Sequence, residues 1–162
     1  MQIKDAIGSF FVEFSKFETH SVGMALRSLS RDSVFVQHAE QLLDFEARLK
    51  LLERMAFARG VPPVLMAELE ACLLLARKLR EHRDEVAHTL INADTPAQDA
   101  SGRVKSRRRN ADLSRLAGLE NLLMPDLERV QEYALEAMDL QEALDGLTRK
   151  LERHLAAAAE EA

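Results

Sequence analysis

The sequence is poor in cysteine and in aromatic residues. It contains one cysteine, no tryptophan and one tyrosine in 162 residues, and aromatic residues make up 5% of the chain. The single Cys72 cannot form a disulfide within the chain, and it directly precedes three leucines, so we expect it in the core rather than at a catalytic site. Leu, Ala, Glu and Arg dominate instead, and this composition predicts a helical protein.

The sequence also lacks a long hydrophobic run. No apolar stretch reaches the length of a membrane span, and the N-terminus has no basic region followed by a hydrophobic stretch, so we expect a cytoplasmic protein with no membrane partner. The net charge of −5 gives the whole chain no general attraction for nucleic acid. With 47% hydrophobic and 30% charged residues, the chain should fold as one domain with its own core.

Apolar side chains recur at steps of three and four along most of the chain, which predicts amphipathic helices. We expect a first helix over residues 2–30, bent near Gly23. A second helix should begin with Asp32 or Ser33 as its cap, and it would bury His38 in the core. The apolar stripe of this second helix consists of Phe35, His38, Leu42, Phe45, Leu49, Leu52 and Ala56.

Gly60 and the pair Pro62–Pro63 mark the boundary between the second helix and a third one. The third helix should run from about Val64 into residues 79–90, and three consecutive leucines at 73–75 make it apolar on more than one face. Such a helix is either buried deeply in its own chain or covered on one side by a partner. We expect a homodimer of twofold symmetry, formed through this helix.

Two further helices are expected near the C-terminus, a short one capped by Asp112 and a long one that opens at Pro125. Together the helices predict an all-α, up-and-down bundle of four to five helices with antiparallel neighbours. It should form a single domain over residues 1–158, followed by a frayed tail at 159–162. The apolar stripe of the last helix consists of Tyr133, Ala137, Leu140, Leu144, Leu147 and Leu151.

Residues 79–90 combine an unusually placed arginine with a histidine. Arg83 lies on an otherwise apolar stripe, where a guanidinium is costly unless it is paired or at an interface, for example with Asp84 or Glu85 of a partner chain. His88 follows five residues later, which is about 140° of rotation on an ideal helix. Arg83 and His88 therefore cannot point the same way from one regular helix. If they act together, either the helix is distorted or two copies of the chain contribute.

Residues 92–110 interrupt the helical pattern with proline, glycine and small polar residues. A segment of this length inside a compact domain is usually functional or disordered. Its positive charge opposes the acidic balance of the chain, so we expect a flexible basic loop that is either an RNA-binding segment or a solvated linker. The basic residues of this loop are Arg103, Lys105, Arg107, Arg108 and Arg109.

The segment Arg-Asp-Glu-Val-Ala-His at residues 83–88 resembles the R-polar-x-x-x-H motif of HEPN domains. Residues 10–18, Phe-Phe-Val-Glu-Phe-Ser-Lys-Phe-Glu, resemble the opening helix of uncharacterised bacterial members, so the resemblance covers most of the chain. HEPN domains are small helical bundles, many of them dimeric and many of them metal-independent ribonucleases. The resemblance implies a HEPN-like fold with Arg83 and His88 as the active pair and Asp84 in support. Asp84 stands where asparagine is commonest in the family.

The same resemblance implies a metal-independent endoribonuclease or an RNA-binding protein, with no cofactor and with a site shared by two chains. The 2′-hydroxyl of RNA would be the nucleophile, His88 would act as a base or an acid near neutral pH, and Arg83 would stabilise the phosphate. The five basic residues of the loop would flank the RNA strand. Beyond RNA, the expected partner is an antitoxin or a regulatory protein, in a toxin–antitoxin or defence-related role.

Two other interpretations leave open whether the chain is an enzyme. It can be a non-catalytic dimerisation or regulatory scaffold, with His88 favoured near the end of a helix by the helix dipole.

Glu85 and His88 also have the Glu-x-x-His spacing of di-iron bundles. Such a site needs a second motif and two further carboxylates, and the chain has one such motif, so we expect no metal.

Overall fold

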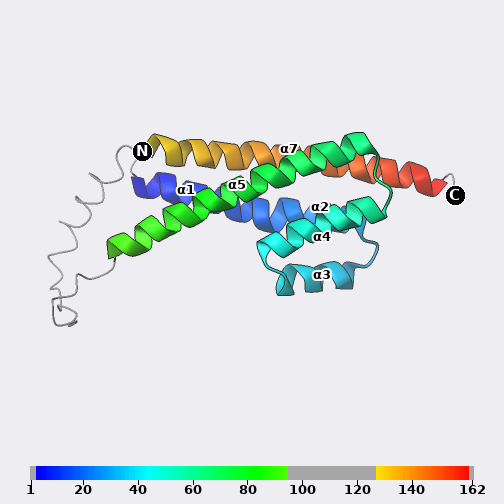
Figure 1. Cartoon of the computed structure of the whole chain (residues 1–162), viewed down its shortest axis with the longest axis horizontal. Coiled ribbons are helices and arrows are strands. Elements are labelled where there is room, and N and C mark those ends of the chain that lie inside the picture. Colours follow the sequence, from blue (N-terminus) through cyan, green and yellow to red (C-terminus); the bar gives the residue numbers. More distant parts are fainter. Residues whose placement is uncertain (1–2, 95–126, 161–162) are drawn as a thin grey trace.

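Figure 1 shows the chain as an elongated set of packed helices. This computed structural model describes residues 3–94 and 127–160, and every regular element within these two ranges is a helix, which confirms the all-α prediction. The predicted loop at 92–110 begins too early, because α5 continues through Asp94, and its basic residues 103–109 lie outside the described residues. The short helix at Asp112 and the predicted helix start at Pro125 also lie outside them. The elements are α1 (Ile3–Lys16), the π-helical turn η1 (Phe17–Ser21), α2 (Val22–Leu29), α3 (Ser33–Leu42), α4 (Phe45–Ala58), α5 (Pro63–Asp94) and α7 (Leu127–Glu160).

The first helix, α1–η1–α2, and the last helix, α7, lie side by side and run in the same direction (Figure 1). Near the start of the pair, the rings of Phe10 and Tyr133 have centroids 5.7 Å apart. Further on, Gln141 Nε2 donates to the backbone oxygen of Glu13 at 3.0 Å. Residue numbers rise together along both helices, so α1 and α7 are parallel.

Helix α5 crosses this pair in the opposite direction (Figure 1). Lys150 Nζ lies 2.6 Å from Glu68 Oε2 at one end of the contact, and His82 stacks on Tyr133 at the other. The residue numbers of α7 decrease in the direction in which those of α5 increase, so the two helices are antiparallel. Among the described elements, the first helix, α5 and α7 alternate in direction, as in an up-and-down bundle. The prediction of antiparallel neighbours is wrong for α1 and α7, which pack extensively against each other and are parallel.

The first helix is continuous, as predicted, but it contains one π-helical turn, at Phe17–Ser21. Gly23 follows the turn closely, and its own role is to leave room for Glu40. A Cβ added to Gly23 would collide with the Glu40 carboxylate, which Arg27 holds with two hydrogen bonds of 2.8 Å. The contact is with the end of a flexible side chain, so a larger residue at position 23 would displace the Glu40 carboxylate and its bonds to Arg27.

The second predicted helix is wrong in one respect, because the structure divides it into α3 and α4. Leu43 and Asp44 adopt extended backbone, and the Asp44 side chain accepts the N–H of Ala47 at 2.8 Å as the cap of a new helix. Because of the break, the residues of the predicted stripe do not lie on one continuous helix face. Phe45 and the stripe residues after it are buried, whereas those before it are exposed, namely Phe35, His38 and Leu42.

The end of α4 follows the prediction closely. Gly60 has φ +67°, a left-handed conformation that glycine adopts without steric cost. Gly60 N–H donates to Phe57 O at 3.0 Å, and Val61 N–H donates to Ala56 O at 3.2 Å. This pair of bonds is a Schellman motif, which satisfies carbonyl groups that the helix end leaves free.

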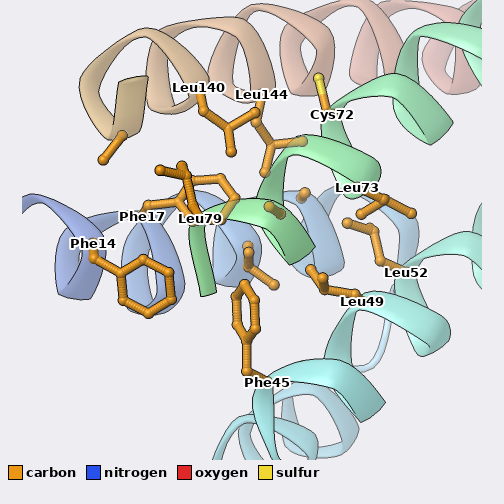
Figure 2. Close-up of a cluster of buried hydrophobic side chains, with 14 of the residues drawn as sticks. Phe14, Phe17, Phe45, Leu49, Leu52, Cys72, Leu73, Leu79, Leu140 and Leu144 are labelled. Atoms are coloured by element: carbon orange, nitrogen blue, oxygen red, sulfur yellow. The ribbon is translucent and has the colours of Figure 1, made fainter. Parts of the chain in front are cut away.

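The core forms where the first helix, α4, α5 and α7 meet, and both α1 and α2 contribute buried residues to it (Figure 2). In α5, Leu73 is buried while Leu74 and Leu75 are more than half exposed, so this helix is apolar on two faces, as expected. All six residues of the stripe predicted for the last helix are buried. Helix α7 continues through Glu160 with exposed side chains from Ala156 onward, and fraying of residues 159–162 stays a prediction.

Among the helices of residues 3–94 and 127–160, none has the length and apolar character that crossing a membrane requires.

Replacing Asp32 with Ala should lower the free energy of unfolding by about 1 kcal/mol, the usual cost of losing a helix cap. Asp32 Oδ1 accepts the N–H groups of Val34 and Phe35, each at 3.0 Å, which identifies Asp32 as the cap of α3. Ser33→Ala is the matched control and should change stability by less than ~0.5 kcal/mol, because the Ser33 hydroxyl makes no hydrogen bond to a described residue. Urea unfolding measures both, and equal effects would contradict this assignment.

Cys72 should react slowly with a thiol reagent in the folded protein. Burial raises the pKa of the Cys72 thiol above its ordinary value, and the negative charge of Glu68 adds to the rise, so less thiolate is present at a given pH. At pH 7.5 the rate of modification should be at least about tenfold below that of the chain in denaturant. A folded protein that reacts as fast as the denatured chain would show that the thiol is accessible and not part of the core.

Candidate functional site

Helix α5 carries the predicted site residues on an uninterrupted α-helix from Leu79 to His88. Five residues separate Arg83 from His88, so their side chains leave the helix about 140° apart. The structure therefore contains the regular helix that the rotation argument assumed, and no distortion brings the two side chains together. In the described part of the chain, no hydrogen bond or ion pair joins Arg83 to His88.

Arg83 is partly buried between α5 and α1, with one-third of its side chain exposed. Its Nη1 lies 2.9 Å from Asp84 Oδ1 of the same chain. Its Cζ lies 5.5 Å from the centroid of the Phe14 ring, within the range of a cation–π contact. The cost of placing a guanidinium on this apolar stripe is thus offset by an ion pair within the chain and by an aromatic face.

A second arginine, Arg80, lies one turn earlier on α5 and contacts the same carboxylate. Arg80 Nε is 3.9 Å from Asp84 Oδ2, and Arg80 Cζ is 6.0 Å from the centroid of Phe45 in α4. The rings of Phe14 and Phe45 have centroids 5.5 Å apart. The two arginines therefore rest on one aromatic pair that joins α1 to α4.

His88 is exposed near the end of the described side chains of α5. Its Nδ1 lies 2.7 Å from the backbone oxygen of Asp84. A carbonyl oxygen only accepts, so Nδ1 carries the proton, and in the neutral ring Nε2 keeps its lone pair. His38 makes the same contact with the oxygen of Val34 at 2.8 Å, and it is exposed, so its predicted core role is wrong.

His82 and Tyr133 form the closest aromatic contact of the described residues. Their ring centroids are 3.9 Å apart and the planes differ by 9°, so the rings stack across the α5–α7 contact. His82 is half-buried and Tyr133 is buried. The contact lies beside the predicted motif, and its geometry gives His82 a packing role.

The sequence reasoning missed Arg80. A signal was present in the three-residue spacing of Arg77, Arg80 and Arg83 along α5, which places them on neighbouring positions of the helix surface. Arg77 differs from the other two because its Nε lies 3.1 and 3.3 Å from the two carboxylate oxygens of Glu46. Contacts with α4 distinguish Arg77 from Arg80, namely those with Glu46 and with Phe45, and they are not visible in one helical period. The Arg80–Asp84 pair, by contrast, has the i,i+4 spacing of a single helix.

No group of three or more His, Cys, Asp or Glu side chains in residues 3–94 and 127–160 is arranged to hold a metal ion. Glu85 and His88 therefore gain no set of further ligands from the described residues of the same chain.

Comparisons with known protein families, with curated proteins and with solved structures find no match to this chain.

Proposed function

We propose that the protein is a HEPN-like homodimer that cleaves RNA without a metal ion, at a site shared by two chains. The observation that carries this proposal is the pair Arg83 and His88, both reachable from solvent and about 140° apart on one regular helix. Within one chain these side chains cannot face a common substrate. Two copies of α5 related by a twofold axis can bring an arginine and a histidine into one cleft.

The exposed leucines of α5 supply a surface for such a dimer. Leu74 and Leu75 are more than half exposed on the same helix that carries the motif. Burying exposed leucines against a second copy would be favourable by roughly 25 cal/mol per Å² of apolar area. His88 lies 14 residues beyond Leu74 on α5, about 21 Å along the helix, so the two candidate sites come close to each other only if the two copies of α5 run parallel.

The chemistry follows from the His88 tautomer. The free lone pair of His88 Nε2 can accept the proton of a ribose 2′-hydroxyl, and the 2′-oxygen then attacks the adjacent phosphorus. The bond from phosphorus to the 5′-oxygen breaks, and that oxygen leaves with a proton from an imidazolium, such as the partner's His88. Arg83 would stabilise the charge that develops on the phosphate oxygens. The products would be a 2′,3′-cyclic phosphate and a 5′-hydroxyl.

A second candidate function is a non-catalytic dimerisation or regulatory module. The observation that favours it is the engagement of Arg83, which already pairs with Asp84 and lies on the Phe14 ring. An arginine held in this way also fits a purely structural role. Ribonuclease activity with cyclic phosphate ends, resistant to a chelator, separates the two functions.

His88→Ala should lower RNA cleavage at least about 100-fold, the typical contribution of a positioned acid or base. The fold should survive, because His88 is exposed and its only described hydrogen bond is to its own helix. Cleavage of a single-stranded RNA is measured in EDTA, with the product ends identified. His38→Ala is the matched control, since His38 is also exposed and also contacts a backbone oxygen four residues earlier. Full activity in the His88→Ala protein would end the catalytic proposal.

Leu74→Glu combined with Leu75→Glu should convert the protein from dimer to monomer, because two charges would be desolvated at the proposed interface. Sedimentation velocity at micromolar concentration measures the outcome. Leu135→Glu, at a similarly exposed leucine of α7, is the control and should leave the dimer intact. A wild-type protein that sediments as a monomer would remove both the interface and the shared site.

A further inference from the structure

Two arginines of α5 converge on the two oxygens of one carboxylate. Asp84 Oδ1 lies 2.9 Å from Arg83 Nη1, and Asp84 Oδ2 lies 3.9 Å from Arg80 Nε. Guanidinium groups bind carboxylates and phosphates alike, and these two contacts are ion pairs and not a bidentate pair of hydrogen bonds. The Asp84 carboxylate therefore occupies a position suited to a phosphate group.

Buried aromatic rings limit the movement of both arginines. Phe14 and Phe45 are almost fully buried, and their contact joins α1 to α4 beneath α5. Arg83 lies over the first ring and Arg80 over the second. Side chains that are already ordered lose less conformational entropy when a ligand binds, so the pair is partly organised for an anion before one arrives.

Among the three side chains in contact, Arg80 and Arg83 carry two positive charges and Asp84 carries one negative charge. Glu81 and Glu85 lie beside them on α5 and make the net charge of residues 80–85 −1 with His82 neutral. The excess positive charge is therefore confined to the three side chains in contact. The side chains of Arg80, Arg83 and Asp84 are 35%, 33% and 43% exposed, so solvent ions can reach them. Ion pairs with this exposure contribute little to stability, and Asp84 can be displaced at small cost.

Arg77 provides an internal comparison. It lies three residues before Arg80 on the same helix, and its side chain is 34% exposed. Unlike Arg80, it lies within hydrogen-bond distance of both oxygens of a carboxylate, that of Glu46, which Lys50 also approaches at 3.8 Å. Two cations therefore share one carboxylate at Glu46 as they do at Asp84. Arg77 differs from Arg80 in its close contact with both oxygens of its carboxylate and not in excess charge.

We infer that Arg80 and Arg83 together form a binding site for one phosphate group, and that Asp84 occupies this site in the free protein as an internal anion that the phosphate displaces. Arg80 is thereby named as a further phosphate-contacting residue, and Asp84 as a competitor of the ligand. The inference deepens the proposed function and rests on it only for the identity of the ligand as a phosphate of RNA. The binding of phosphate itself rests on the contacts of these three side chains.

Isothermal titration of the full chain with inorganic phosphate, at constant ionic strength, tests the inference. Arg80→Gln and Arg83→Gln should each weaken binding about tenfold, as expected for the loss of one charge-assisted contact. Arg77→Gln removes the same charge from the same helix and should change affinity less than about twofold. Asp84→Asn should strengthen binding about threefold, because it removes the competing charge while keeping a hydrogen-bond acceptor. Circular dichroism verifies that each variant is folded.

Three outcomes would overturn the inference. Equal losses in Arg77→Gln and Arg80→Gln would mean that phosphate responds to the general field of α5 and not to a site. Weaker binding in Asp84→Asn would mean that Asp84 supports the ligand and does not compete with it. No binding to either the wild type or the Asp84→Asn protein would remove the site. A failure of this inference and a failure of the proposed function can be told apart. Phosphate binding without RNA cleavage would support the phosphate site and contradict the ribonuclease proposal.

Discussion

Contacts between phenylalanine rings join the helices on which the candidate site is built. Phe14 contacts Phe10 within α1, and Phe45 of α4 contacts both Phe14 and Phe17, with centroid distances of 5.5 to 6.3 Å. Aromatic pairs of this kind contribute about 0.5–1.5 kcal/mol each beyond the burial of their area. Arg80 of α5 lies over one ring of this cluster. The position of the cationic groups on α5 thus depends on the packing of the core directly below them.

Much of the fold could be predicted because the last helix and α5 have a simple apolar period that tertiary packing respects. The second predicted helix failed because a period of 3.6 residues continued in the sequence through Leu43 and Asp44. An aspartate in the middle of an apparent helix is also a good cap, and only the packing of α4 against α2 and α5 determines which role it takes. Exposure of Phe35 followed from that single break.

The candidate site was predictable only in part. Arg83 was identified because a charge interrupts an apolar stripe, which is visible along one helix. Arg80 was not, since its significance comes from Phe45, which lies 35 positions earlier in the chain, and from a carboxylate shared with Arg83. Nor could the sequence specify that Asp84 pairs within its own chain. The contact of Arg80 with Phe45 joins two elements, and no local pattern contains it, whereas the Arg80–Asp84 and Arg83–Asp84 pairs are local to α5.

The π-helical turn at Phe17–Ser21 determines where the first helix can change in length. On a regular helix, the buried faces of α1 and α2 would point in directions about 100° apart, the rotation of roughly one residue. The π turn accommodates one additional residue and so removes this rotation. Both halves can then face α7 from one continuous rod. An insertion or deletion elsewhere in the rod would rotate one half away from its partner, so the turn is the position at which this helix can gain or lose a residue during evolution.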